Sequence, residues 1–295
     1  AAFDPALSEY ARYTLEGHGK HLRPALLALS AEAVGRAGEA HVTAAVVIEM
    51  VHLATLVHDD VMDEAAMRRG RPTFASRWGN ETAVLFGDCL FAEALRLAAS
   101  FPTPEVCRAV AASTNTVCAG EILQTRSRGR FDLSLSDYLR MIDMKTAELF
   151  ALSCDLAGFL AEAPADTRRA LELFGREFGV AYQIYDDCQD VFGSEAQTGK
   201  SLGTDLAKGK LTLPLLELRQ RVSNGDLMRL EKLFHDGQVS ELETLRALLR
   251  RHGVLSACGQ AIRTRLERAR ESLGALAPGP GAERLADCTR FLEHQ

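Results

Sequence analysis

The sequence predicts an all-α fold. Ala, Leu, Glu and Arg dominate the chain, and these residues favour helices. Apolar residues recur every three or four positions in stretches such as LRPALLALSAEAV (residues 22–34) and TLRALLRRHGVL (residues 244–255), which places them on one face of a helix. Runs of alternating Val, Ile and Thr, which are typical of strands, are missing from the sequence.

Glycine, proline and polar clusters divide the chain into about ten predicted helices of ordinary length. The breaks lie at residues 35–38, 101–104, 126–132, 164, 199–203, 223–226 and 277–281. The stretch Thr103-Pro104-Glu105 predicts an N-cap followed by a first-turn proline and acid. Ser240 and Glu243 predict a capping box for a helix that Gly253 would end. No break resembles a domain linker, so we expect one domain over residues 1–295.

The charge balance limits the possible partners. The 34 basic and 40 acidic side chains leave a net charge of −6, which argues against a general nucleic-acid-binding surface. Any anionic ligand must therefore meet a local basic cluster.

Cysteine usage and hydropathy predict a cytoplasmic protein without a transmembrane segment. The seven cysteines contain no CxxC pair, so we expect reduced thiols rather than disulfides or structural zinc. The longest apolar run, residues 42–57, is interrupted by Glu49 and His52 and favours a buried core helix. The chain begins at Ala1 rather than Met, which leaves open whether an N-terminal segment is removed.

Two acidic motifs have the same spacing. LVHDDVMD places Asp59, Asp60 and Asp63 after an apolar stretch, and YQIYDDCQD does the same for a second set, namely Asp186, Asp187 and Asp190. Like charges at i and i+4 weaken a helix, so each motif needs a compensating cation. A single acidic cluster is usually a solvated helix end, but two of identical spacing favour a site for a hard cation such as Mg²⁺.

Basic residues beside glycines are candidates for holding an anion between the two motifs. Each alone is typical of a protein surface, but together they suit a diphosphate. They occur in GHGKHLRP, RRGRPT, KTAELF and GKSLGTDLAKGKLTLP, and they are Lys20, Arg23, Arg68, Arg69, Lys145, Lys200 and Lys210.

The ordered set GKxxRP, HxxTxxHDDxxD, RRGxPT, KTA, QxxDDxxD and GKxxGTDLxxGKxTLP, from Lys20 to Pro214, resembles the trans-isoprenyl diphosphate synthases, or polyprenyl synthases. The resemblance implies an all-α isoprenoid-synthase-type bundle of helices around a deep central apolar cavity, working as a homodimer. It also implies the reaction. An allylic diphosphate ionises, and its carbocation alkylates the double bond of isopentenyl diphosphate. Loss of a proton leaves a trans chain one C5 unit longer. No carboxylate without a metal role stands out in the sequence, so we expect the released diphosphate to accept that proton.

The resemblance implies a role for each matching residue, with three Mg²⁺ ions per active site. The principal metal ligands are Asp59, Asp63 and Asp186, and the supporting ones are Asp60, Asp187 and Asp190. The allylic diphosphate is held by Arg68, Lys145, Lys200 and Lys210. Isopentenyl diphosphate is held without metal by Lys20, Arg23, His52 and Arg69. Polar groups near the reacting carbons are Thr146 and Gln183. The residues expected to carry catalysis are Asp59, Asp60, Asp63, Asp186, Lys145 and Lys200.

Two histidines need separate interpretation. His21 stands where the family commonly has arginine, and a neutral side chain there would weaken the isopentenyl diphosphate site. His58 precedes the first aspartate pair, and we interpret it as a packed or hydrogen-bonded histidine rather than a catalyst.

The helix before the first motif predicts the product length. In this family, bulky aromatics four and five residues before the motif stop the chain early, but here those positions hold Thr55 and Ala54. Further down a similar face lie Val51 and Val47, the latter about 18 Å below Asp59. The expected product is therefore longer than C20, unless Phe150 and Phe159 on facing helices close the cavity.

Four alternatives remain open. A farnesyl or geranylgeranyl diphosphate synthase would differ only in product length, and a subunit of a heteromeric synthase would need a partner. A class I terpene cyclase would lack a second diphosphate site, and its second metal motif normally mixes Asn, Ser and Glu. A metal phosphohydrolase built on His52 and His58 would explain neither the second DDxxD motif nor the basic set.

Overall fold

Helices account for nearly all of the regular structure, which confirms the predicted all-α class. The structure is a computed structural model that describes residues 5–17, 19–194 and 202–293. In chain order, its helices and strands are α1 (Ser8–Leu15), α2 (Leu22–Ala33), α3 (Glu39–Met62), β1 (Met67–Arg68), β2 (Arg71–Pro72), α4 (Phe74–Trp78), α5 (Asn80–Ala98), α6 (Glu105–Arg126), α7 (Leu135–Ile142), α8 (Glu148–Leu160), α9 (Ala165–Phe192), α11 (Thr204–Ala207), α12 (Leu213–Arg221), α13 (Asn224–Asp236), α14 (Leu242–Arg251), α15 (Val254–Ser272) and α16 (Pro280–Glu293).

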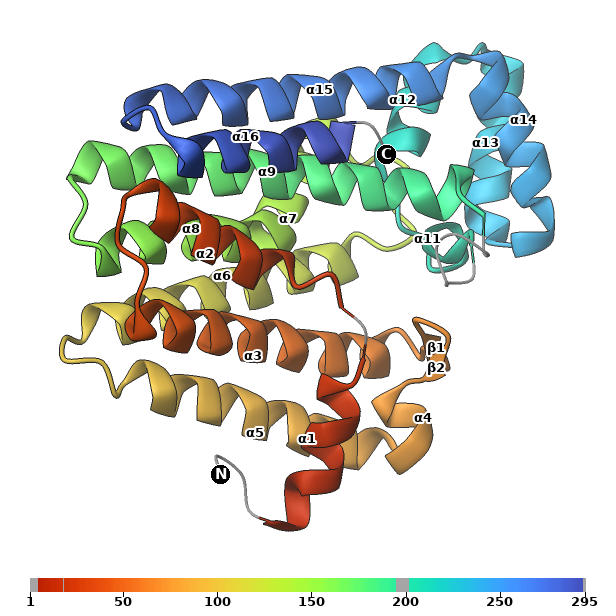
Figure 1. Cartoon of the computed structure of the whole chain (residues 1–295). Coiled ribbons are helices and arrows are strands. Elements are labelled where there is room, and N and C mark those ends of the chain that lie inside the picture. Colours follow the sequence, from red (N-terminus) through yellow and green to blue (C-terminus); the bar gives the residue numbers. More distant parts are fainter. Residues whose placement is uncertain (1–4, 18, 195–201, 294–295) are drawn as a thin grey trace.

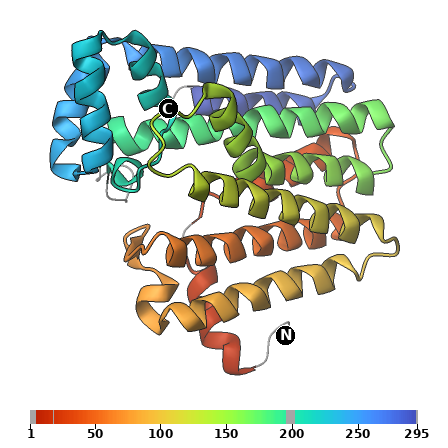
Figure 2. The same ribbon diagram turned by 180° about the vertical axis from the view of Figure 1, so that it is seen from behind.

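The long helices run nearly parallel in stacked rows (Figures 1 and 2). Helix α3 packs against α5 on one side and against α2 and α8 on the other. Helix α9 lies between α8 and α15. The two helices that carry the acidic motifs, α3 and α9, are thus separated by one layer of helices.

Helix α8 joins two apolar cores. Leu149, Leu152 and Leu156 pack into the core around α3, α5 and α6. Phe150 and Cys154 pack into the core formed by α9 and the C-terminal helices. Because opposite faces of α8 are buried, this helix fixes the distance between the two motif-bearing helices.

Helix α3 is the apolar run predicted to form a core helix. Among the described residues it is the one helix long and apolar enough to cross a membrane by length and composition. In the structure, nine of its residues are buried in the interior, which agrees with a core helix.

The predicted breaks that fall in the described residues all separate helices, but two predicted caps are wrong. Helix α6 begins at Glu105 with Pro104 as its N-cap residue, and Thr103 provides no capping hydrogen bond. Ser240 lies in a 3₁₀ turn (Val239–Glu241), where its hydroxyl contacts Gln238 instead of the helix end. Gly253, with φ of 64°, follows the end of α14 as predicted. The break at residues 199–203 lies partly outside the described residues.

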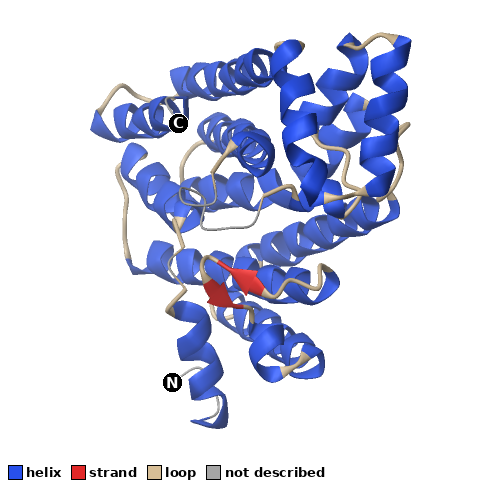
Figure 3. Ribbon diagram, turned by 90° about the vertical axis from the view of Figure 1, so that its right-hand side faces the viewer, coloured by secondary structure: helices blue, strands red, loops and turns tan. Residues whose placement is uncertain are grey.

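The sequence analysis missed the hairpin formed by β1 and β2, shown in red in Figure 3. Its two-residue loop, Arg69-Gly70, has positive φ at both positions, as a type I′ turn requires. The strands are only two residues long, too short for an alternating pattern to be visible in the sequence.

We expect Gly175→Ala to lower the free energy of unfolding by about 2–4 kcal/mol, because a side chain there has no room. A Cβ atom at Gly175 on α9 would lie 2.4 Å from the carbonyl oxygen of Phe150 on α8. The matched control is Gly225→Ala on α13, where a Cβ would meet nothing within 4 Å. The control should be neutral or slightly stabilising. Urea denaturation of the three proteins tests this expectation, and equal stabilities would contradict it.

Candidate active site

Both acidic motifs open into one cavity of about 830 Å³, a size typical of ligand-binding pockets. Asp59 and Asp63 reach it from the C-terminal end of α3, and Asp186 and Asp187 reach it from α9. The predicted juxtaposition of the two motifs is therefore present.

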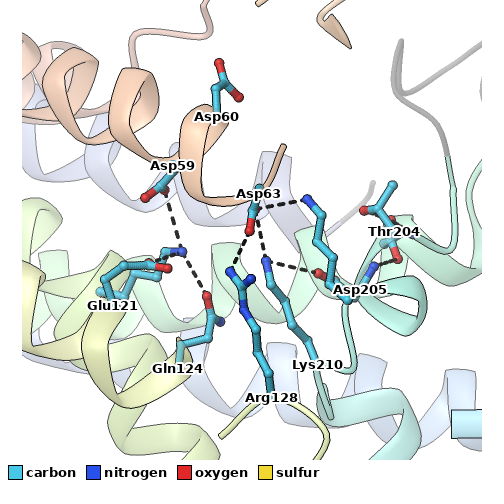
Figure 4. Close-up of polar contacts among 12 residues, drawn as sticks. Asp59, Asp60, Asp63, Glu121, Gln124, Arg128, Thr204, Asp205 and Lys210 are labelled. Atoms are coloured by element: carbon cyan, nitrogen blue, oxygen red, sulfur yellow. Dashed lines mark hydrogen bonds and ion pairs between the residues drawn. The ribbon is translucent and has the colours of Figure 1, made fainter. Parts of the chain in front are cut away.

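Lysine and arginine side chains pair with the two cavity-facing aspartates of the first motif (Figure 4). Asp59 lies 3.6 Å from the Nζ of Lys145. Asp63 accepts a hydrogen bond of 2.6 Å from Arg128 and lies 3.0 Å from Lys208 and 3.3 Å from Lys210. The compensating cations that the motif required are thus supplied by the chain itself.

Burial and charge shift the pKa values of these two aspartates in opposite directions. Burial raises the pKa of Asp59 to about 6, although Lys145 opposes the shift. Burial would also raise the pKa of Asp63, but Lys210 and Lys208 outweigh it and lower that pKa to about 2. Asp63 is therefore a fixed negative charge at every physiological pH.

Asp60 faces away from the other two (Figure 4) and is not part of the cavity wall. It is buried and accepts a hydrogen bond of 2.8 Å from the Nε of Arg68. Arg68 itself lines the cavity, where it was predicted to bind a diphosphate.

The three aspartates of the second motif have different surroundings. Asp186 and Asp187 both line the cavity, but Asp187 is buried and accepts hydrogen bonds from Tyr138 (2.5 Å) and Gln183 (2.7 Å). Burial raises the pKa of Asp187 well above its ordinary value. Asp190 lies off the cavity wall and accepts hydrogen bonds from the backbone N–H groups of Thr204 and Asp205 at the start of α11. Direct metal coordination by Asp60 and Asp190 thus finds no support in their positions.

A π-helical turn, Asp143–Ala147, directs Lys145 and Thr146 into the cavity. Such turns widen a helix locally and are frequent at functional sites. Thr146 donates a hydrogen bond of 2.7 Å to Gln183, so the two residues predicted near the reacting carbons are in contact. Lys145 also pairs with Glu121 and donates to Gln124 on α6. These two α6 residues were missed because no motif in the sequence marks them.

Beside the main cavity lies a small basic pocket lined by all four residues predicted to bind the second diphosphate, namely Lys20, Arg23, His52 and Arg69. The Arg23 guanidinium lies 4.3 Å from the ring centroid of Phe150, and burial lowers its pKa to about 10, so it remains a cation at neutral pH. Burial, with Arg23 and Arg69 nearby, holds the pKa of His52 well below its ordinary value. The His52 imidazole is therefore neutral at physiological pH.

The two histidines singled out in the sequence have defined partners. His21 lines the basic pocket, and its Nδ1 lies 2.9 Å from a carboxylate oxygen of Glu49 on α3. This contact orients the imidazole, which the sequence analysis did not foresee. The ring of His58 contacts the carbonyl oxygen of Val84 at 3.0 Å, which confirms a hydrogen-bonded histidine.

The apolar wall of the cavity differs from the one predicted. Thr55 lines the cavity, whereas Ala54, Val51 and Val47 are fully buried against neighbouring helices and do not contribute to its wall. Part of the remaining apolar wall comes from α5 and α6, through Val84, Phe91, Val117, Cys118 and Ile122, and part from α3 and α7, through Leu56, Val61, Met62, Met141 and Ile142.

The two proposed plugs do not close this cavity either. Phe150 belongs to the α9 core and borders the small basic pocket, and Phe159 packs beneath Arg168. The aromatic residues that line the cavity are Phe91 on α5, Tyr138 on α7 and Tyr182 on α9.

The donor set fits magnesium. Asp59, Asp63 and Asp186 offer carboxylate oxygens, which hard cations prefer. Among residues 5–17, 19–194 and 202–293, no three acidic, histidine or cysteine side chains form a ready-made metal-ligand group. Diphosphate oxygens and water would therefore complete the coordination. Lys200 lies outside the described residues, and its role stays a prediction.

We expect Asp205→Asn to stabilise the metal-free protein at pH 8 by about 1–3 kcal/mol. Burial raises the pKa of Asp205 from 3.8 to about 6, although Lys210 opposes the shift. The folded state therefore binds a proton more tightly than the unfolded state, so the wild type gains stability as the pH falls from above 6 toward 4. The difference in free energy of unfolding between Asp205→Asn and the wild type should therefore become smaller as the pH falls over that range. Urea denaturation at pH 8, 6 and 5 with EDTA measures it, and a pH-independent difference would contradict the expectation.

Three comparisons place this geometry among known proteins. Residues 4–250 match the family model described as Polyprenyl synthetase. The chain is 36% identical over 282 residues to an all-trans-nonaprenyl-diphosphate synthase (geranyl-diphosphate specific) of Rhodobacter capsulatus, a match that covers 95% of this chain and 86% of the relative. It is 42% identical over 210 residues to the heptaprenyl diphosphate synthase component 2 of Geobacillus stearothermophilus, which covers 71% of this chain and 66%, just under two thirds, of the relative.

A solved structure shares the whole fold. The polyprenyl synthase from Caulobacter crescentus CB15, complexed with calcium and isoprenyl diphosphate, is 29% identical and superimposes with a TM-score of 0.94. The superposition covers 99% of this chain and 89% of the other.

Proposed function

The chain belongs to the polyprenyl synthetase family, and we propose that it condenses isopentenyl diphosphate with an allylic diphosphate to make a trans-polyprenyl diphosphate longer than C20. The observation that carries this proposal is that both DDxxD motifs contribute aspartates to one cavity, with a smaller basic pocket beside it. A condensing enzyme needs two diphosphate sites of this kind, one that promotes ionisation and one that does not.

In the larger cavity, Asp59, Asp63 and Asp186 would hold magnesium, and Lys145 and Lys210 would bind the diphosphate. Bound magnesium would supply Lewis-acid stabilisation of the departing diphosphate. The lysines lie in a partly buried site, where their charge stabilises the leaving group more strongly than it would in water. The same cavity joins an apolar wall, which keeps water from the allylic carbocation.

In the smaller pocket, Lys20, Arg23 and Arg69 would bind the diphosphate of isopentenyl diphosphate by charge alone. Its double bond would extend toward the larger cavity, since Arg23, His52 and Arg69 line both spaces. Thr146 and Gln183, joined by their hydrogen bond, would lie near the reacting carbons and orient the carbocation. We propose the released diphosphate as the base for the final proton, because Asp59, Asp63 and Asp186 would be occupied by magnesium.

We further propose that the chain acts as one domain in a cytoplasmic homodimer. Helix α5 carries exposed apolar side chains outside the cavity wall, among them Leu85 (59% exposed) and Leu95 (40% exposed), which a second copy would cover. The name of the Geobacillus relative, a synthase component, favours a heteromeric alternative. Light scattering of the purified chain decides between a dimer and a monomer that awaits a different partner.

The reaction is tested by incubating the protein with Mg²⁺, labelled isopentenyl diphosphate and each of dimethylallyl, geranyl, farnesyl and geranylgeranyl diphosphates. Chromatography then sizes the products. A ladder that ends beyond C20 is the expected result. A stop at C15 or C20 would assign a short-chain synthase, and no condensation from folded protein would favour the heteromeric subunit.

A further inference from the structure

We propose that Arg128 and Lys208 form part of the allylic diphosphate site, and that Asp63 holds both of them while the site contains no ligand. This inference rests on the proposed function and deepens it. Neither residue belongs to the basic set that the sequence motifs predicted.

The first argument is the local charge. Three cations converge on the single carboxylate of Asp63, namely Arg128 at 2.6 Å, Lys208 at 3.0 Å and Lys210 at 3.3 Å. One further carboxylate, Asp205, lies 3.8 Å from Lys210. Among the described residues, the ion pairs of this cluster thus join three cations to two carboxylates, and an anion that enters the cavity would pair with the third cation.

The second argument is the unused capacity of Arg128. One Nη of its guanidinium binds Asp63, while its Nε is buried and has no hydrogen-bond partner among the described residues. A buried donor without a partner is costly, which favours a ligand that uses it. A guanidinium with spare donors also matches the bidentate geometry of phosphate oxygens.

The third argument is that the two loops carrying these cations form one unit. The N–H of Gly129 donates a hydrogen bond of 2.8 Å to the carbonyl oxygen of Gly209. A Cβ atom on Gly209, whose φ is 61°, would lie 2.9 Å from the nitrogen of Gly129, so the approach requires glycine. Lys208 and Lys210 line the cavity, and the joined loops hold Arg128 beside them, where it contacts the cavity-lining Asp63 (Figure 4 shows Arg128 and Lys210 beside Asp63).

The consequence is an exchange of partners. When Asp63 turns its oxygens to a metal, it gives up its ion pairs with Arg128 and Lys208. Both cations are then available to the phosphate oxygens of the same ligand. Asp63 therefore keeps the two side chains ordered before binding, which reduces the entropy lost on binding.

The test is isothermal titration of inorganic diphosphate into the protein with Mg²⁺ present, for the wild type, Arg128→Gln, Arg128→Lys and Lys208→Gln. The matched control is Arg130→Gln, an exposed arginine of the same loop that pairs with Asp132. We expect Arg128→Gln to weaken diphosphate binding by about 10- to 100-fold, with partial recovery in Arg128→Lys. Lys208→Gln should weaken it by about tenfold or less, and the control should bind like the wild type.

Steady-state kinetics separate a binding role from a structural one. We expect the KM for the allylic diphosphate to rise in Arg128→Gln and the KM for isopentenyl diphosphate to stay unchanged, because the latter binds in the other pocket. Unchanged diphosphate binding in both Arg128→Gln and Lys208→Gln, with a lowered Tm, would overturn the proposal and assign the two residues to loop packing. Weakened binding in a protein that condenses no primer would support this inference while refuting the proposed function.

Discussion

Asp186→Asn should lower the turnover number by about a hundred- to a thousandfold, with little change in stability. Asp186 faces the cavity from α9, opposite the aspartates of α3, and an amide cannot supply the negative charge that a divalent cation needs there. Stabilising the charge on a leaving group contributes strongly to catalysis, so its loss appears in turnover. The measurement is the condensation rate at saturating substrates over a range of Mg²⁺ concentrations.

The control for this prediction lies on the same helix. Asp166→Asn removes a carboxylate near the start of α9 that is 88% exposed and pairs with Arg169. That variant should keep wild-type turnover, since surface ion pairs contribute little. If Asp186→Asn retained most of its turnover with the wild-type dependence on Mg²⁺, the second motif would serve the fold rather than the chemistry.

Local spacing made the acidic motifs predictable. Residues four apart on a helix share a face whatever the rest of the fold does, so Asp59 with Asp63 could be placed together from the sequence. The helical conformation of each long segment was predictable for the same reason, because the spacing of apolar residues does not depend on the tertiary arrangement. The family motifs added residues far apart in sequence, and the structure brings Thr146 to Gln183 as expected from them.

Features that depend on packing between distant segments were not predictable. Arg128 and Lys208 meet at Asp63 because two loops are joined through Gly129 and Gly209, and no local pattern announces that pairing. The composition of the cavity wall could not be predicted from the sequence for the same reason. Helical spacing placed Val51 on the stripe of Thr55, but only knowledge of where α5 and α6 lie shows that Val51 is packed in the core.

Thr55→Phe should shorten the product while leaving condensation intact. Thr55 faces the cavity one turn below Asp59, about 6 Å along the helix axis. Among the residues that the structure describes, its hydroxyl bonds only to the carbonyl oxygen of His52 in the same helix, so the substitution removes a local contact and adds an aromatic ring to the cavity. The added ring would clash with a prenyl chain that grows past it. The fraction of products beyond C20 should therefore fall by about tenfold or more.

The same substitution on the same helix provides the control. Thr43 lies near the start of α3, outside the cavity wall, and its hydroxyl also bonds within the helix, to Glu39. Thr43→Phe should therefore leave the product ladder unchanged. If Thr55→Phe also left the ladder unchanged while the first condensation proceeded, the chain would have to grow along the wall formed by α5 and α6. Product length would then be set by Phe91, and Phe91→Ala would lengthen the ladder where Thr55→Phe had failed to shorten it.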